Sequence, residues 1–79
     1  MNIKVIGKGC DKCEALYDNV IEATNNLGIK ADIEKVEELL DIVKLGVKTV
    51  PSVMVDGELE ISGEVANVEQ IEEVLNKHK

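Results

Sequence analysis

The chain has 79 residues and a net charge of −7, with 16 acidic residues against nine lysines and no arginine. This balance argues against a surface for nucleic-acid phosphates, and no stretch approaches the ~18 apolar residues of a membrane span. A chain of this length is expected to form a single domain over residues 1–79. Residues 1–4 lead directly into a strand pattern and lack the apolar region of a signal peptide, so we expect a cytoplasmic protein with no nucleic-acid or membrane partner.

The N-terminal half of the chain predicts two strands and two helices. A β-branched run at residues 2–7 predicts a strand. Across residues 11–27 apolar side chains recur at spacings of three and four, which predicts a helix with a left-handed C-cap at the glycine that follows. Residues 29–36 alternate and predict a second strand, whereas the spacing over residues 36–43 predicts a short helix that ends at Gly46.

The C-terminal half of the chain predicts a hairpin and a helix. Strand-like residues 52–55 and 58–61 flank an Asp-Gly pair at 56–57, which is a two-residue turn signal. Asn67 and Gln70 have the spacing of a capping box at the start of a final helix. The order is therefore βαβαββα. A right-handed crossover makes the first two strands parallel, so the prediction is an α/β fold with a four-stranded mixed sheet flanked by three helices.

The only two cysteines, Cys10 and Cys13, stand where the first strand gives way to the first helix. Free N–H groups and the helix dipole favour an anion there, so we expect the pKa of Cys10 to lie below that of a free thiol, with Lys12 as electrostatic support. Cys13 shares the predicted buried face of the helix, where desolvation disfavours a thiolate. The spacing predicts that Cys10 attacks a substrate disulfide and that Cys13 resolves the mixed disulfide.

A second feature is the segment Thr49-Val50-Pro51-Ser52, which holds the only proline of the chain. For an X-Pro bond considered alone, the trans form is favoured. With this segment and the cysteine pair, the chain resembles the thioredoxin superfamily along its whole length. More narrowly, it is similar to the small, glutaredoxin-sized thioredoxin-like proteins of prokaryotes, also described as redox-active disulfide proteins. The motifs that carry the resemblance are Gly9-Cys10-x-x-Cys13, Gly46-Val47, Pro51, Asp56-Gly57 and Gly63-Glu64-Val65.

The resemblance implies a thioredoxin-like fold with strand order 2-1-3-4, the first and last helices on one face and the middle helix on the other. It also implies a cis Val50-Pro51 bond beside the two cysteines, with the backbone of Val50 available to pair with an extended substrate segment. Lys4 stands where thioredoxins place a buried acid, which removes the usual proton acceptor for the second cysteine. The glutathione-binding residues of glutaredoxins are not matched at residues 61–64, so glutathione is not the expected partner.

We therefore predict an enzyme, a thiol-disulfide oxidoreductase whose catalytic Cys10/Cys13 pair exchanges electrons with disulfide-containing protein substrates. Val50 and Pro51 are the predicted substrate-binding residues. The sequence shows no flavin or nucleotide motif, so we expect a thioredoxin-reductase-like protein to supply the electrons. No cofactor other than the redox-active disulfide is expected, and the protein is expected to be a monomer.

Two other functions are also compatible with the cysteine pair. Copper and zinc carriers of ferredoxin-like fold also place a Cys-x-x-Cys pair between a first strand and a first helix. Those carriers usually have Met two residues before the first cysteine, where this chain has Lys8. The second alternative is a non-catalytic interaction module whose cysteines have no chemical role. No metal ligands are expected, and His78 is given no role because it lies in a C-terminal tail where helices fray.

Overall fold

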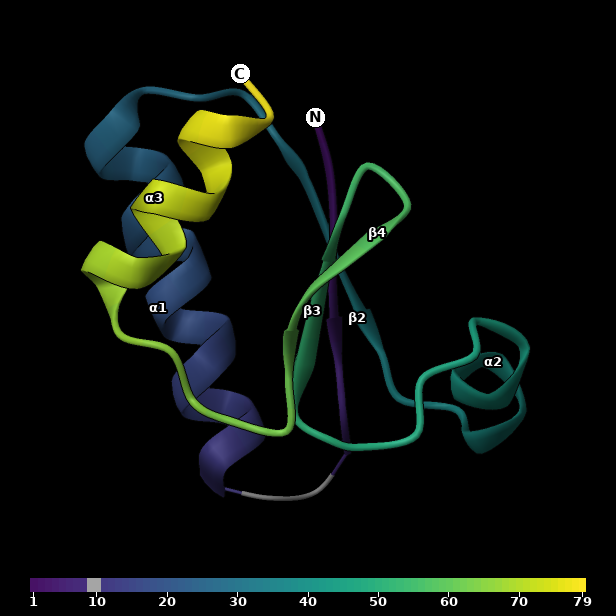
Figure 1. The fold of residues 1–79 in the computed structure, drawn as a ribbon. Helices are drawn as coiled ribbons and strands as arrows, with labels where there is room; N and C mark the ends of the chain where they lie inside the picture. The colour runs from purple at the N-terminus through teal and green to yellow at the C-terminus, as the bar shows by residue number, and fades with distance from the viewer. Residues whose placement is uncertain (9–10) are drawn as a thin grey trace.

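The computed structural model describes residues 1–8 and 11–79, and these residues form four strands and three helices (Figure 1). Their order confirms the predicted βαβαββα. Among the described residues, no helix is both long enough and apolar enough to span a bilayer. In chain order the elements are β1 (Asn2–Ile6), α1 (Asp11–Leu27), β2 (Asp32–Val36), α2 (Leu39–Lys44), β3 (Ser52–Val55), β4 (Glu58–Ser62) and α3 (Val68–Lys77).

The four strands form one mixed sheet in the order β2-β1-β3-β4, which confirms the expected topology. Ile3 in β1 lies opposite Ile33 of the parallel strand β2 and opposite Val55 of the antiparallel strand β3. β3 and β4 are joined by Asp56 and Gly57, which have φ angles of 49° and 85°. Positive φ at both central positions is what a two-residue hairpin turn of type I′ requires, so the predicted hairpin is confirmed.

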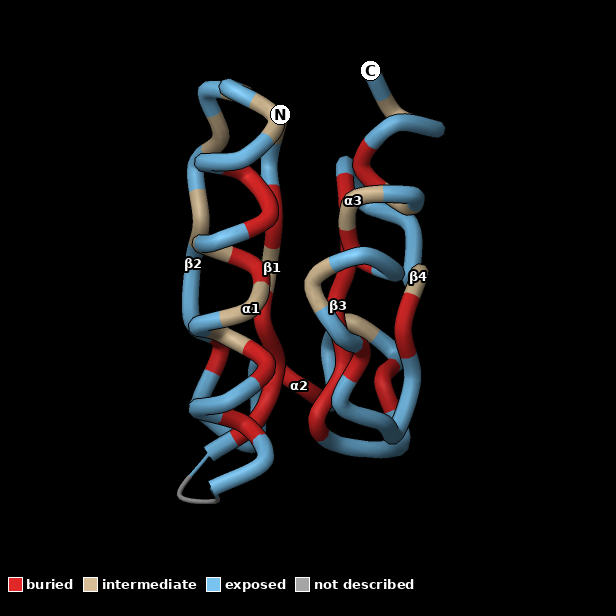
Figure 2. The backbone as a smooth tube through the Cα atoms, turned by 90° about the vertical axis from the view of Figure 1, so that its left-hand side faces the viewer, coloured by how far each residue is buried: buried red, intermediate tan, exposed pale blue. Residues whose placement is uncertain are grey.

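Two apolar layers lie on opposite faces of the sheet. Figure 1 shows α1 and α3 together on one face and α2 on the other, and Figure 2 shows buried segments recurring along one side of α1 and running along β3. The larger cluster includes Ile3 and Val5 of β1, which pack with Leu16 and Leu75 of the two helices. The smaller cluster, on the α2 face, consists of Ile6, Val36, Ile42, Val47 and Met54.

Local signals in the sequence explain where α1 and α3 begin and end. The predicted apolar face of α1 is the buried one, and Gly28 follows the helix with φ of +65°, a conformation that a glycine adopts without steric cost. α3 begins with the predicted capping box. Asn67 Oδ1 accepts the N–H of Gln70 at 2.8 Å, and Gln70 Oε1 accepts the N–H of Asn67 at 2.9 Å.

The region around α2 differs from the prediction. β2 begins at Asp32 and not at residue 29, and Val36 is its last residue and not the first residue of the helix. Leu39 and Leu40 in α2 are 73% and 74% exposed, whereas Ile42 is the buried residue of this helix. A helix of six residues touches the sheet through a single turn, so most of its apolar side chains stay in solvent.

Candidate active site

Cys13 lies in the first turn of α1 on the face that packs against the sheet. It is 6% exposed and shares this face with Leu16 and Val20. Its sulfur is not a free thiol, because Cys13 is disulfide-bonded in the structure. The predicted partner Cys10 lies outside the described residues. The low exposure of Cys13 confirms its expected burial.

Gly7, directly after β1, lies against Cys13. Its φ is +149°, and a Cβ at this position would overlap the Sγ of Cys13 and lie 3.3 Å from its Cβ. The same Cβ would lie 3.7 Å from Cα of Pro51. Gly7 thus marks the point where the end of β1, the first turn of α1 and the segment before β3 approach one another. A glycine in or next to a strand often indicates such a close approach of backbone, and this was the signal by which Gly7, not among the predicted site residues, could have been found.

The segment before β3 is fixed to the end of β4 by polar contacts. Pro51 is buried, and its carbonyl oxygen accepts the N–H of Gly63 at 2.9 Å. The hydroxyl of the fully buried Ser52 donates to the carbonyl oxygen of Thr49 at 2.6 Å. Across the hairpin, Thr49 Oγ1 and Ser62 Oγ lie 2.8 Å apart. The contacts to the carbonyl oxygens of Pro51 and Thr49 hold the backbone around Pro51 beside Cys13, whereas the exposed contact between Thr49 and Ser62 joins side chains only.

Val50 occupies the exposed side of this segment. The peptide bond between Val50 and Pro51 is cis, which is the geometry that the resemblance implied. Val50 is 49% exposed, and no backbone hydrogen bond joins it to another residue in the described part of the chain. Within these residues its N–H and C=O groups are therefore not used in backbone pairing.

A cavity of about 370 Å³ lies next to Val50 on the α2 side. Leu39, whose side chain is otherwise in solvent, contributes to its wall. This cavity has no signature in the sequence, because its lining comes from segments that only the packed chain brings together. The residues that line it are Lys8, Glu37, Leu39, Ile42, Val47, Lys48 and Val50.

The charged residues near the start of α1 differ in their contacts. Lys12 is exposed and makes no ion pair or side-chain hydrogen bond with residues 1–8 or 11–79. Glu14 pairs with Lys35 at 3.0 Å, and this hydrogen bond raises the pKa of Lys35. The ammonium group of Lys35 also lies 4.4 Å from the centre of the Tyr17 ring. Lys4 stands where thioredoxins place a buried acid, and its Nζ lies 3.7 Å from Oε2 of Glu34.

The strand order, the helix placement and the position of Cys13 beside the Val50-Pro51 segment define a thioredoxin-like fold. The family described as "Thioredoxin domain" matches residues 1–76. Over 76 residues the chain is 42% identical to a protein named thioredoxin from Methanothermobacter thermautotrophicus, an alignment that covers 96% of this chain and 99% of that protein. It is 37% identical over 76 residues to a thioredoxin from Methanocaldococcus jannaschii, covering 96% and 87% of the two chains. The chain belongs to the thioredoxin family.

Proposed function

We propose that the protein is a thiol-disulfide oxidoreductase in which Cys10 and Cys13 form the redox couple. The observation that carries this proposal is the placement of Cys13, which is disulfide-bonded, buried at the start of α1 and packed against Gly7 beside Pro51. The chain contains one other cysteine, Cys10, three residues earlier, and its identity as the partner in the disulfide is part of the proposal. Membership of the thioredoxin family supports the same chemistry.

In the proposed reaction the reduced protein transfers two electrons to a disulfide of a partner protein. The Cys10 thiolate attacks one sulfur of that disulfide, so a mixed disulfide forms and the partner's other sulfur leaves as a thiolate. Cys13 then loses its proton to water, and its thiolate attacks the Cys10 sulfur, which breaks the mixed disulfide and releases the partner's second thiolate. The partner's two thiolates take up two protons, and the Cys10/Cys13 pair is left oxidised. The burial of Cys13 suits a resolving role, because incoming disulfides cannot reach it directly.

We also propose that the partner binds across Val50. An extended segment of the partner would form backbone hydrogen bonds with the N–H and C=O of Val50, as in strand addition to a sheet edge. Its apolar side chains would enter the cavity that Leu39 and Val50 line. Lys8 and Lys48 border the same cavity and would favour acidic residues in the partner.

A separate donor is part of the proposal, because each turnover leaves the protein oxidised. A thioredoxin-reductase-like protein would return two electrons and two protons to the cysteine pair. A dithiol of this kind acts as a reductant in a reducing compartment, and we therefore propose the cytoplasm as its location. That the protein acts as a monomer remains a prediction.

A redox titration combined with two serine variants tests the proposal. Equilibration in thiol/disulfide buffers at pH 7, followed by alkylation and mass measurement, is expected to show one two-electron transition between about −200 and −280 mV. With insulin as the disulfide substrate, Cys10→Ser is expected to abolish turnover, and Cys13→Ser is expected to accumulate a mixed disulfide through Cys10. Turnover retained by Cys10→Ser, or the absence of an intramolecular disulfide in every buffer, would contradict the proposal.

A further inference from the structure

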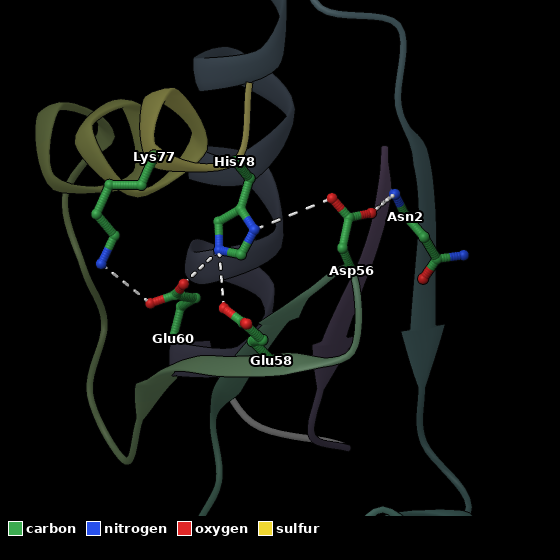
Figure 3. Close-up of polar contacts among 6 residues, drawn as sticks. All are labelled: Asn2, Asp56, Glu58, Glu60, Lys77 and His78. Atoms are coloured by element: carbon green, nitrogen blue, oxygen red, sulfur yellow. Dashed lines mark hydrogen bonds and ion pairs between the residues drawn. The ribbon is translucent and has the colours of Figure 1, made fainter.

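A second group of titratable side chains lies at the opposite end of β3 from Pro51. It gathers around the Asp56-Gly57 turn, and Figure 3 shows three carboxylates and one imidazole that converge beneath the end of α3. Three of these side chains offer donor atoms that all lie within 4.8 Å of one another. The three are Glu58, Glu60 and His78.

His78 directly follows the last residue of α3, at the C-terminal end where fraying was predicted and no role was expected. It caps the helix with its backbone N–H, which bonds to the carbonyl oxygen of Leu75 at 3.1 Å. Its side chain is only 12% exposed and points toward β4 and the hairpin turn (Figure 3). The ring is therefore held in one place by the fold.

A bulge in β4 directs Glu60 toward this ring. Met54 pairs with Leu59 and Val53 pairs with Ile61, so Glu60 is an extra residue with no partner of its own in the ladder. Bulges re-aim side chains, and they concentrate at sheet edges and near functional sites. Here the bulge lets Ile61 enter the larger core while the Glu60 carboxylate reaches His78.

The distances between the donor atoms suit one small cation. His78 Nε2 is in direct contact with Glu60 Oε2 and lies 3.6 Å from Glu58 Oε2. Around a tetrahedral zinc ion with bonds of about 2.0–2.1 Å, two ligand atoms lie roughly 3.3 Å apart. Small side-chain adjustments would therefore bring the three donors to one ion.

Asp56 lies on the Nδ1 side of the ring. Its Oδ2 lies 4.0 Å from His78 Nδ1, which is beyond hydrogen-bond distance, and its Oδ1 accepts the backbone N–H of Asn2 at 2.8 Å, so the carboxylate is held in place (Figure 3). His78 Nε2 contacts Glu60. A zinc ion bound at Nε2 would place the ring proton on Nδ1, where the Asp56 carboxylate could accept it after a small side-chain shift. The carboxylate–histidine–zinc arrangement of many metal sites works in this way.

The local charge also favours a cation. Asp56, Glu58 and Glu60 bring three carboxylates together around His78, and Lys77 pairs with one of them, Glu60. Lys77 is 66% exposed and contacts Glu60 through Oε1, at 3.3 Å, so Oε2 remains directed at the ring. Lys77 is largely in solvent, so it offsets only part of this negative charge, and a bound divalent ion would offset the rest.

We propose that Glu58, Glu60 and His78 form a zinc-binding site, with water as the fourth ligand and Asp56 as the outer carboxylate. One imidazole with two carboxylates suits zinc, whereas magnesium and calcium prefer oxygen donors alone. The ion would join β4 to the end of α3. The site lies at the opposite end of β3 from Pro51, so this inference does not depend on the proposed redox function.

Isothermal titration of the oxidised protein with ZnCl₂ tests the site, because oxidation removes the cysteine thiols as competing ligands. One zinc ion per chain is expected. His78→Ala and Glu58→Gln are expected to weaken zinc binding at least tenfold, and Asp56→Asn by about 10–100-fold, the usual effect of losing an outer-shell partner. Asparagine tolerates the positive φ at position 56, and the exposed Glu58 can be changed without loss of packing.

Glu73→Gln is the matched control, because it removes one negative charge from the exposed face of α3 without touching a donor. This variant is expected to bind zinc within twofold of the unmodified protein, and 1 mM MgCl₂ is expected to leave zinc binding unchanged. Undetectable binding by the oxidised protein at 1 mM zinc would overturn the proposal. Equal weakening by Glu73→Gln and Glu58→Gln would also overturn it, since that result would mean general charge attraction.

Discussion

Gly7 and Cys13 lie so close together that no side chain fits between them. A Cβ on Gly7 would overlap the Sγ of Cys13, and it would lie 3.7 Å from Cα of Pro51. The absence of a side chain at Gly7 is therefore a condition for placing the sulfur of Cys13 against the segment that precedes β3. The close approach of Cys13 and Pro51 in the candidate site therefore depends on glycine at position 7.

Gly7→Ala is expected to lower the free energy of unfolding by about 3 kcal/mol, because overpacking costs about 1–3 kcal/mol and a backbone conformation that L side chains rarely adopt costs about 1–3 kcal/mol more. Urea unfolding measures this change, and insulin reduction is expected to be lost with it. Gly28→Ala is the matched control, since Gly28 also has positive φ but has open space around it. It is expected to cost about 1–2 kcal/mol and to leave insulin reduction intact. Equal effects of the two variants would contradict the role assigned to Gly7.

Ser52→Ala is expected to loosen the segment that carries Pro51. The buried Ser52 hydroxyl donates to Thr49 at 2.6 Å, and loss of a buried hydrogen bond costs about 1–2 kcal/mol. Urea unfolding and the KM for insulin are both expected to change, with the KM rising. The control is Thr49→Val, which removes only the exposed contact with Ser62 and is expected to cost about 0.5 kcal/mol. A Ser52→Ala variant with unchanged stability and KM would show that this hydrogen bond does not position the segment.

Leu39→Ser is expected to weaken binding of a protein substrate without affecting the fold. Leu39 is 73% exposed, so the stability change is expected to stay within about 0.5 kcal/mol. Loss of about 1 kcal/mol of apolar contact in the cavity would raise the KM for insulin about fivefold, with kcat unchanged. Turnover of hydroxyethyl disulfide, which is too small to fill the cavity, is expected to be unaffected.

Leu40→Ser is the matched control for the cavity. Leu40 is equally exposed, at 74%, and follows Leu39 in α2, but it does not line the cavity. The KM of the Leu40→Ser variant for insulin is expected to match that of the unmodified protein. If Leu39→Ser and Leu40→Ser raised the KM equally, the substrate would contact the exposed surface of α2 as a whole, and the role of the cavity would be contradicted.

Glu14→Gln is expected to lower the pKa of Lys35 toward its ordinary value, because the hydrogen bond from Lys35 to Glu14 is the main cause of its raised pKa. A raised pKa in the folded state means that the pair stabilises the protein below the unfolded pKa of about 10.4 and loses this contribution as the pH rises further. NMR titration of the Lys35 side chain measures the change. Glu34→Gln, which removes the partner of Lys4 instead, is expected to leave the Lys35 pKa unchanged.

Much of the fold follows from local signals. The three- and four-residue spacing of α1, its C-terminal glycine, the Asp56-Gly57 turn and the Asn67/Gln70 capping box each depend on residues close in the chain. The burial of Cys13 follows from its place in the same helical pattern. The strand order and the cis bond before Pro51, in contrast, came from resemblance to a family, because the residue pattern alone favours a trans bond.

The elements, the faces of the long helices and the two segments that carry the candidate redox site can be read from the residue pattern. These properties depend on side-chain periodicity and turn chemistry within a few residues. Three contacts could be seen only in the folded chain: Gly7 lies against Cys13, Leu39 stays in solvent beside a cavity, and His78 meets Glu58 and Glu60. Each of these contacts joins residues from different elements, so it exists only once packing against the sheet has fixed where those elements lie.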